Sequence, residues 1–101
     1  MADKLSPDDR TAILASMDGW SEEAGGEKIA KTFKFSGFDS AWGFMTRVAI
    51  KAQSMDHHPE WSNVYATVEV ALTTHDAGGV TELDIELAKY MDIAAGSTGL
   101  K

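Results

Sequence analysis

The sequence contains no cysteine. This absence excludes disulfide bridges, thiolate metal ligands and cysteine nucleophiles together, and it fits a reducing compartment. Basic residues are also few, since nine Lys and Arg stand against sixteen Asp and Glu, for a formal net charge of −7. Nucleic-acid binding draws its affinity from basic side chains that meet phosphates, and the nine here form no cluster. We therefore expect no direct binding to DNA or RNA, and a neutral or weakly polar small molecule is a more natural ligand.

Long hydrophobic runs are missing as well. No apolar stretch approaches the roughly 18 residues that a membrane span needs, and the N-terminus opens no signal peptide. We therefore expect a cytoplasmic protein with no membrane partner. The 101 residues have room for a single domain over residues 1–101 with one hydrophobic core. A core of that size is small, so the chain gains from self-association.

Two helices are expected in the first half of the chain. Ser6 is a good N-cap with Pro7 at the first helical position, and Gly19 is expected to close this helix. Asp39 is the expected cap of a second helix over residues 40 to about 55, where apolar residues recur at helical spacing.

Several β segments separate the helices. Residues 20–23 and 27–35 are typical of two strands joined by a short loop. Residues 63–74 form the richest β segment, and the pattern does not decide between one long strand and two pieces with a bend near Tyr65. On this pattern, one face is expected to carry Val64, Ala66, Val68, Val70 and Leu72.

A third helix is expected near the C-terminus. Thr81 and Asp84 have the spacing of a capping box, whereas residues 95–101 have no packing pattern and are expected to fray. With two strands in the last β segment, the order is α-β-β-α-β-β-α. We expect an α+β fold in which three helices pack on one face of a four-stranded antiparallel sheet. The exposed edges of such a sheet are available for dimerisation.

The three histidines of the chain, His57, His58 and His75, lie within nineteen residues and near the ends of expected elements. Histidine ordinarily titrates nearest neutrality, so three that share a pocket favour proton transfer. Taken alone, adjacent histidines before a proline are more often an exposed loop, and His75 is more often a surface residue. A metal site is not expected, because neighbouring histidines point in different directions and no H-x-H or H-x-x-x-H pair occurs.

Two other residues near the histidines have more than one interpretation. Trp61 is placed to form a flat apolar wall for an aromatic ligand, or to belong to the core. Asp84 is placed to be the acid of the capping box or to belong to the pocket.

The run Asp-His-His-Pro-Glu-Trp-Ser-Asn-Val-Tyr at residues 56–65, followed by Thr73-Thr74-His75 and by Asp84, closely resembles the signature of the pterin-4a-carbinolamine dehydratases. Trp20 and the segments 33–38 and 44–49 are also similar to that family, so the resemblance extends over about residues 4–93. A lone His-His-Pro would be weak, but the ordered set with its spacings is specific.

The resemblance implies a lyase that dehydrates 4a-hydroxytetrahydrobiopterin to quinonoid dihydropterin and water in tetrahydrobiopterin recycling. It implies no metal and no organic cofactor. His57 and His75 are then the candidates for the proton-transfer pair, with His58 binding and assisting. The substrate-binding residues that it implies are Asp56, Trp61, Thr73, Thr74 and Asp84.

One position departs from the family pattern. Four residues before His57 the family commonly has a charged residue, whereas Gln53 stands here and cannot ionise. The family also forms homodimers or homotetramers, and its animal members assist dimerisation of a hepatocyte homeodomain factor. A transcription-factor partner is thus implied only by analogy. A protein-binding module and a non-enzymatic pterin carrier remain open as other functions.

Overall fold

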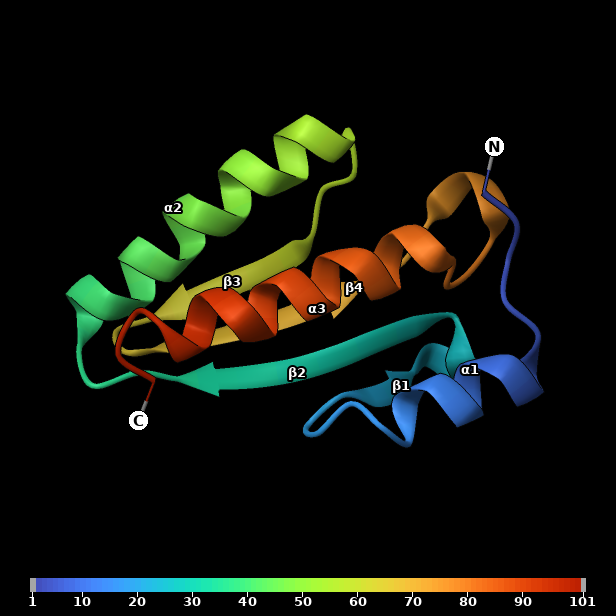
Figure 1. Ribbon diagram of the computed structural model, residues 1–101, viewed down its shortest axis with the longest axis horizontal. Helices are drawn as coiled ribbons and strands as arrows, with labels where there is room; N and C mark the ends of the chain where they lie inside the picture. The colour runs from blue at the N-terminus through green and yellow to red at the C-terminus, as the bar shows by residue number, and fades with distance from the viewer. Residues whose placement is uncertain (1, 101) are drawn as a thin grey trace.

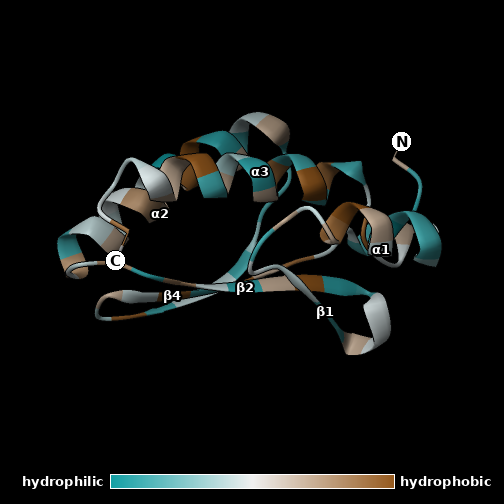
Figure 2. Ribbon diagram, turned by 60° about the horizontal axis from the view of Figure 1, so that its bottom comes forward, coloured by the Kyte–Doolittle hydropathy of each residue, from teal (hydrophilic) through white to brown (hydrophobic). Residues whose placement is uncertain are grey.

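A computed structural model describes residues 2–100, and all statements about the structure concern this range (Figure 1). Its helices are α1 (Pro7–Leu14), α2 (Phe38–Met55) and α3 (Glu82–Gly96). Its strands are β1 (Ser21–Glu23), β2 (Lys28–Lys34), β3 (Glu60–Val64) and β4 (Thr67–Leu72), which form one antiparallel sheet in the order β1-β2-β4-β3. The helices lie on one face of this sheet (Figure 2). The expected α+β fold and its element order are therefore confirmed.

The hydrophobic core lies between the helices and the sheet. Along β2 and β4 alternate side chains face the helices, so Ile29 and Phe33 are buried together with Val68, Val70 and Leu72. The helix α2 contributes residues at spacings of three and four, namely Ala41, Phe44, Val48 and Ala52. The opposite face of the sheet carries no helix, and none of the described helices is long and apolar enough to span a bilayer.

The ends of the first two helices only partly follow the expectations. Ser6 caps α1 by accepting a hydrogen bond from the Asp9 amide, as predicted. The predicted closure at Gly19 is wrong, because α1 already ends at Leu14. The predicted Asp39 cap is also wrong: Gly37 is the N-cap of α2 in an extended conformation, and Asp39 lies within the first turn.

The richest β segment is a hairpin of two strands. Tyr65 adopts a left-handed conformation (φ 55°) in the turn, and Val64 pairs with Thr67 directly across it. Because the chain reverses here, Val64 faces away from the helices and is 74% exposed, while Val68 is buried. The expectation that Val64 shares a face with Val68 is therefore wrong.

The C-terminal segment is more ordered than the sequence suggests. The helix α3 continues through Gly96 and buries Ala95 completely. The amide of Ser36 then donates to the Gly99 carbonyl at 3.0 Å, and Leu100 pairs with Phe35 in an isolated bridge. These contacts differ from the fraying expected from residue 95 onward, and residue 101 of that segment lies outside the described range.

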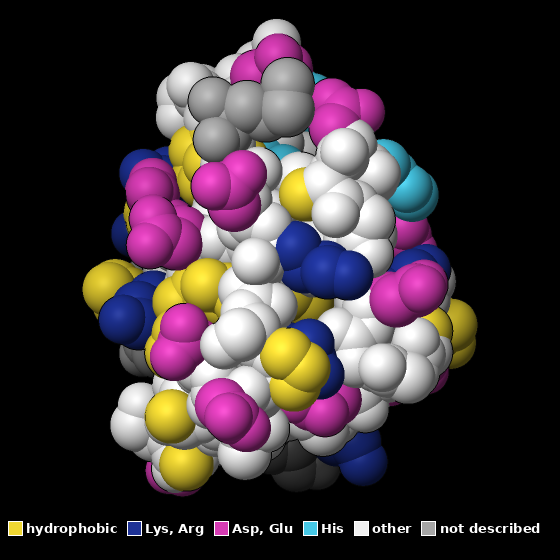
Figure 3. Space-filling view, turned by 90° about the vertical axis from the view of Figure 1, so that its right-hand side faces the viewer, with side chains coloured by type: hydrophobic (Ala, Val, Ile, Leu, Met, Phe, Trp, Pro, Cys, Tyr) yellow, Lys and Arg dark blue, Asp and Glu magenta, His cyan; other side chains and the backbone are white. Residues whose placement is uncertain are grey.

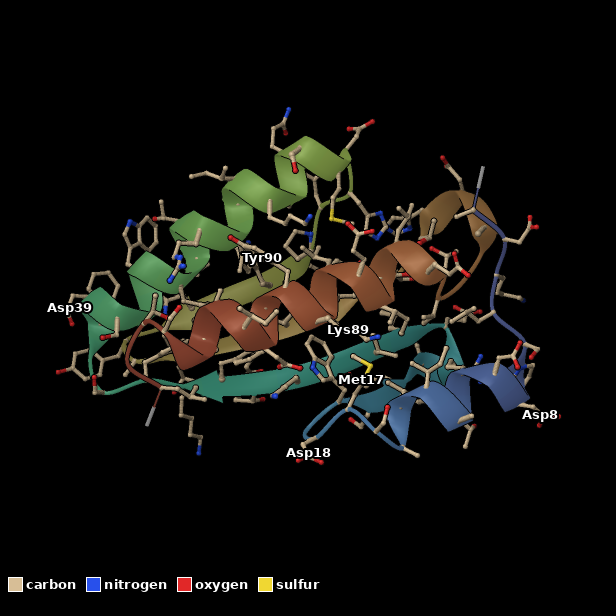
Figure 4. All side chains as sticks on the ribbon, viewed as in Figure 1. Asp8, Met17, Asp18, Asp39, Lys89 and Tyr90 are labelled. Carbon is tan, nitrogen blue, oxygen red and sulfur yellow. The ribbon has the colours of Figure 1, made fainter. Side chains whose placement is uncertain are left out.

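A lysine interrupts the apolar face of β2. Lys31 donates to Asp92 of α3 at 2.8 Å and to the carbonyl of Asp18 at 2.9 Å, and its ammonium lies 4.9 Å from the ring centre of Phe33. Asp92 also accepts from the indole of Trp20 at 3.0 Å. This network joins the loop after α1, on which Figure 4 labels Asp18, to α3, on which it labels Lys89.

Candidate active site

The end of α2 sets the direction of the first two histidines. Asp56 takes a left-handed conformation (φ 52°, ψ 42°), and the amide of His57 donates to the Ala52 carbonyl five residues back at 3.0 Å. This is the bonding pattern of a Schellman cap, in which Asp56 occupies the position that glycine usually takes. The sharp end to the helix leaves His57 buried and His58 exposed.

His57 is paired with a buried carboxylate. Its Nε2 lies 2.6 Å from Oδ1 of Asp84, and the Asp84 side chain has no exposed surface. Asp84 is the third residue of α3 and also completes the capping box, because its Oδ2 accepts from the Thr81 amide at 2.8 Å. The capping-box interpretation of Asp84 is therefore confirmed, and its second oxygen contacts the histidine that lines the cleft.

One hydroxyl group contacts the same carboxylate, and a second supports the first. Oγ1 of Thr74 lies 2.8 Å from Oδ2 of Asp84 and 2.8 Å from Oγ1 of Thr81. Oγ1 of Thr81 also accepts from the Leu83 amide at 3.2 Å. The carboxylate thus receives donors at both oxygens, as a buried charge requires.

His58 is held by the residue that departs from the family pattern. Its Nε2 lies 3.0 Å from Oε1 of Gln53, in the last turn of α2. An amide oxygen can only accept, so in this contact Nε2 of His58 carries the hydrogen. Gln53 therefore orients His58 without a negative charge.

His75 lies in the short 3₁₀ helix η2 (His75–Ala77), and its side chain is 82% exposed. Its Nε2 is 3.4 Å from Oε2 of Glu60, whose other oxygen pairs with Lys28 at 2.6 Å. The hydrogen bond from Lys28 lowers the pKa of Glu60 below 4.5, and the charges of Lys28 and His75 contribute in the same direction.

The three histidines line one surface cleft of about 270 Å³. The residues lining it are Asp56, His57, His58, Thr73, Thr74, His75 and Asp76. At this end of the molecule, histidine reaches the surface among acidic side chains (Figure 3). Six of these residues were predicted for the site from the sequence, and Asp84 lies directly behind His57.

Trp61 does not line this cleft. It pairs with Val70 across β3 and β4, so it shares the face that packs against the core, where it is partly buried. Among residues 2–100, no three side chains of the metal-binding types are arranged to hold an ion. Glu60 was not predicted as a site residue. Glu60 lies within the quoted motif, but its contact with His75 depends on how β3 and η2 meet.

The geometry around His57 is suited to proton transfer. Nε2 of His57 is committed to Asp84, and within residues 2–100 no buried side-chain nitrogen or oxygen lacks a partner. No partner of Nδ1 is found in this range, so Nδ1 reaches solvent, on a residue that lines the cleft. His57 thus combines a fixed ring with an accessible nitrogen, which is the geometry that a general acid or base needs.

Comparisons with known proteins agree on one family. The model of the family described as pterin 4 alpha carbinolamine dehydratase matches residues 3–94. A protein of Nitrobacter hamburgensis is 57% identical over 100 residues, which cover 99% of each chain. One of Bradyrhizobium sp. strain ORS 278 is 58% identical over 98% of this chain and all of its own. Both carry pterin-4-alpha-carbinolamine dehydratase as a provisional name.

Solved structures agree with the fold. A crystal structure from Brucella melitensis, described as a transcriptional coactivator/pterin dehydratase, is 45% identical with a TM-score of 0.90. The match covers 93% of this chain and all of that one. A pterin dehydratase-like protein, described as a RuBisCO assembly factor in the alpha-carboxysome, is 22% identical with a TM-score of 0.68. That match covers 80% of this chain and 94% of the other, and it concerns the fold alone.

Proposed function

The chain belongs to the pterin-4-alpha-carbinolamine dehydratase family, and from this premise we propose that it dehydrates 4a-hydroxytetrahydrobiopterin to quinonoid dihydropterin and water. The observation that carries the catalytic part of the proposal is the buried pair of His57 and Asp84 at the wall of a cleft that two more histidines line. The proposal includes a cytoplasmic role in tetrahydrobiopterin recycling.

The reaction needs one acid and one base. The bond between C4a and the hydroxyl oxygen breaks, and an acid protonates that oxygen so that it leaves as water. N5 loses its proton to a base, and the electron pair left on N5 forms the double bond to C4a. Each proton transfer of this kind contributes a factor of about 10² to 10⁴ when a side chain is correctly placed.

The three imidazoles differ in how firmly they are held. His57 is held by Asp84 and presents Nδ1, whereas His75 stands on η2 and is exposed apart from its contact with Glu60. We assign these two to the proton-transfer pair, with His58 binding and assisting. The roles of acid and base are assigned to the histidines together and not to single residues, because neighbouring histidines titrate together.

The remaining site residues are proposed to bind the pterin. Asp56, Thr73 and Thr74 line the cleft, and it is the backbone of the two threonines that is proposed to meet the polar edge of the ring. Asp84 is excluded from direct contact by its complete burial and acts through His57. Trp61 does not line the cleft, so its proposed contribution is to hold β3 against the core.

The proposal is tested with chemically generated 4a-hydroxytetrahydropterin, whose decay is followed by ultraviolet absorbance. The purified protein should accelerate the decay, and His57→Ala or His75→Ala should lower the catalysed rate by about 10² or more. His57→Gln is made in parallel, because its amide can still donate to Asp84 and so preserve the fold. Lys34→Ala on the open face of the sheet is the control.

The outcomes separate the possible functions. A protein that binds the pterin but leaves its decay at the spontaneous rate would be a carrier, and the enzymatic proposal would be wrong. Wild-type rates in both histidine variants would remove these two residues from the mechanism.

A further inference from the structure

The hydrogen bonds around Asp84 have a direction that follows from their partners. Backbone amides can only donate, so the Leu83 amide donates to Oγ1 of Thr81 and the Thr81 amide donates to Oδ2 of Asp84. Thr74 has a single hydroxyl hydrogen and lies 2.8 Å from both the carboxylate and the Thr81 hydroxyl. When Asp84 is ionised, that hydrogen goes to the carboxylate, and Thr81 donates to Thr74.

The result is a one-way chain of donors that ends on the carboxylate. Thr81 donates to Thr74, Thr74 donates to Oδ2 of Asp84, and Oδ1 is left to accept from His57 at 2.6 Å. His57 must then carry its hydrogen on Nε2. In the neutral ring the lone pair therefore lies on Nδ1, the nitrogen that reaches solvent.

The hydroxyl of Thr74 has no other structural task within residues 2–100. The capping box of α3 is complete with Thr81 and Asp84 alone. The loop that contains η2 is closed by the backbone of Thr74, whose amide donates to Gly79 and whose carbonyl accepts from Gly78. The hydroxyl contacts only Asp84 and Thr81.

We propose that Thr74 is a positioning residue, whose hydroxyl, supported by Thr81, holds the Asp84 carboxylate and thereby keeps the hydrogen of His57 on Nε2. The inference deepens the proposed function, because it rests on proton transfer by His57. Removal of a purely structural hydroxyl would affect folding alone. Removal of a positioning hydroxyl also changes the tautomer of His57 and the catalysed rate.

The decisive variants are Thr74→Val, which keeps the shape and removes the hydroxyl, and Thr74→Ser, which restores it. Thr98→Val is the matched control, since its hydroxyl donates to the Ala94 carbonyl at the far end of the same helix. Two quantities are measured: kcat and KM for the 4a-hydroxytetrahydropterin, and the tautomer of His57 by ¹⁵N NMR without substrate.

We expect Thr74→Val to lower kcat on the order of tenfold, the loss of one hydrogen bond to a charged group, with KM nearly unchanged. Without the Thr74 hydroxyl the carboxylate is free to turn away from Nε2, and the ring then loses the acceptor that fixes its hydrogen there. His57 should therefore move from the Nε2–H form toward a mixture with the Nδ1–H form. Thr74→Ser should recover both values, and Thr98→Val should change neither.

A Thr74→Val protein that keeps the wild-type kcat and tautomer overturns the inference, as does a loss that Thr74→Ser fails to restore. If the valine variant does not fold, Thr74→Ala is measured in its place, because a smaller side chain avoids pressing a methyl against the carboxylate. The tautomer is read without turnover. Hence an inactive wild-type protein refutes the proposed function, while the spectrum still decides the inference.

Discussion

Replacing Asp84 with Asn should separate the stability of this protein from its activity. The amide oxygen of Asn can accept from the Thr81 amide and the Thr74 hydroxyl, as Oδ2 does now. Its NH₂ group then takes the place of Oδ1, beside Nε2 of His57. That nitrogen must become an acceptor, so the hydrogen of His57 moves to Nδ1.

The expected magnitudes follow from counting these bonds. Asp84→Asn keeps all three hydrogen bonds of the side chain and leaves no charge unpaired, so the free energy of unfolding should change by no more than about 1.5 kcal/mol. Asp84→Ala leaves the buried donors of His57 and of the Thr81 amide without an acceptor at about 1 kcal/mol or more each, so it should lose at least about 2 kcal/mol. The rate in Asp84→Asn should nevertheless fall by about 10² to 10⁴, because the neutral ring no longer presents a lone pair at Nδ1.

Urea unfolding followed by circular dichroism measures the first quantity, and stopped-flow absorbance of the carbinolamine measures the second. The reasoning is refuted if Asp84→Asn retains a rate within about threefold of wild type. It is also refuted if Asp84→Asn proves as unstable as Asp84→Ala, since the amide would then not have replaced the carboxylate in the network.

Three further predictions concern parts of the molecule outside this pair. Lys31→Met should lower the free energy of unfolding by about 1 kcal/mol, because it removes the partly buried bond to Asp92, and an unchanged urea midpoint would contradict this. Because Lys28 lowers the pKa of Glu60, this group contributes stability above about pH 4.5 that is lost as the pH falls through the lowered pKa. The urea midpoints of wild type and Glu60→Gln should thus converge between pH 7 and pH 3, and a constant difference would exclude the coupling. Self-association remains a prediction, and light scattering should give a dimer or tetramer whose mass falls in Trp42→Glu, since Trp42 is 55% exposed on α2. A monomeric wild type would refute it.

The sequence predicted the fold well where each element has its own local signal. Ser6, with Pro7 after it, marks the start of α1, and Thr81 marks the start of α3, because caps are formed by residues close in the chain. The pattern does not decide between one long strand and a hairpin, because the turn depends on a left-handed Tyr65 that composition does not predict. The C-terminal contacts were missed because Leu100 pairs with Phe35, a residue just beyond β2 that lies far away in the sequence.

The sequence predicted most of the residues that line the candidate site, but not how their side chains are arranged. For Trp61 the sequence allows either the pocket or the core, and strand alternation and its pairing with Val70 put it on the core side of the sheet. Asp84 offered two roles, and only the structure places the two carboxylate oxygens against different partners. Nothing in the sequence indicated the contact of the Thr74 hydroxyl with Asp84, because the two residues are ten positions apart and a loop lies between them.

The dual use of Asp84 ties the site to the cooperativity of the whole domain. His57 follows the end of α2 and Asp84 lies in the first turn of α3, so their bond joins two helix ends that are 27 residues apart. Helix ends ordinarily fray at little cost, which would let a site built on them open and close independently. Here fraying of either end breaks the same buried contact. The catalytic geometry should therefore persist for as long as the two helices stay docked, and amide exchange in the first turn of α3 should approach the rate of global unfolding.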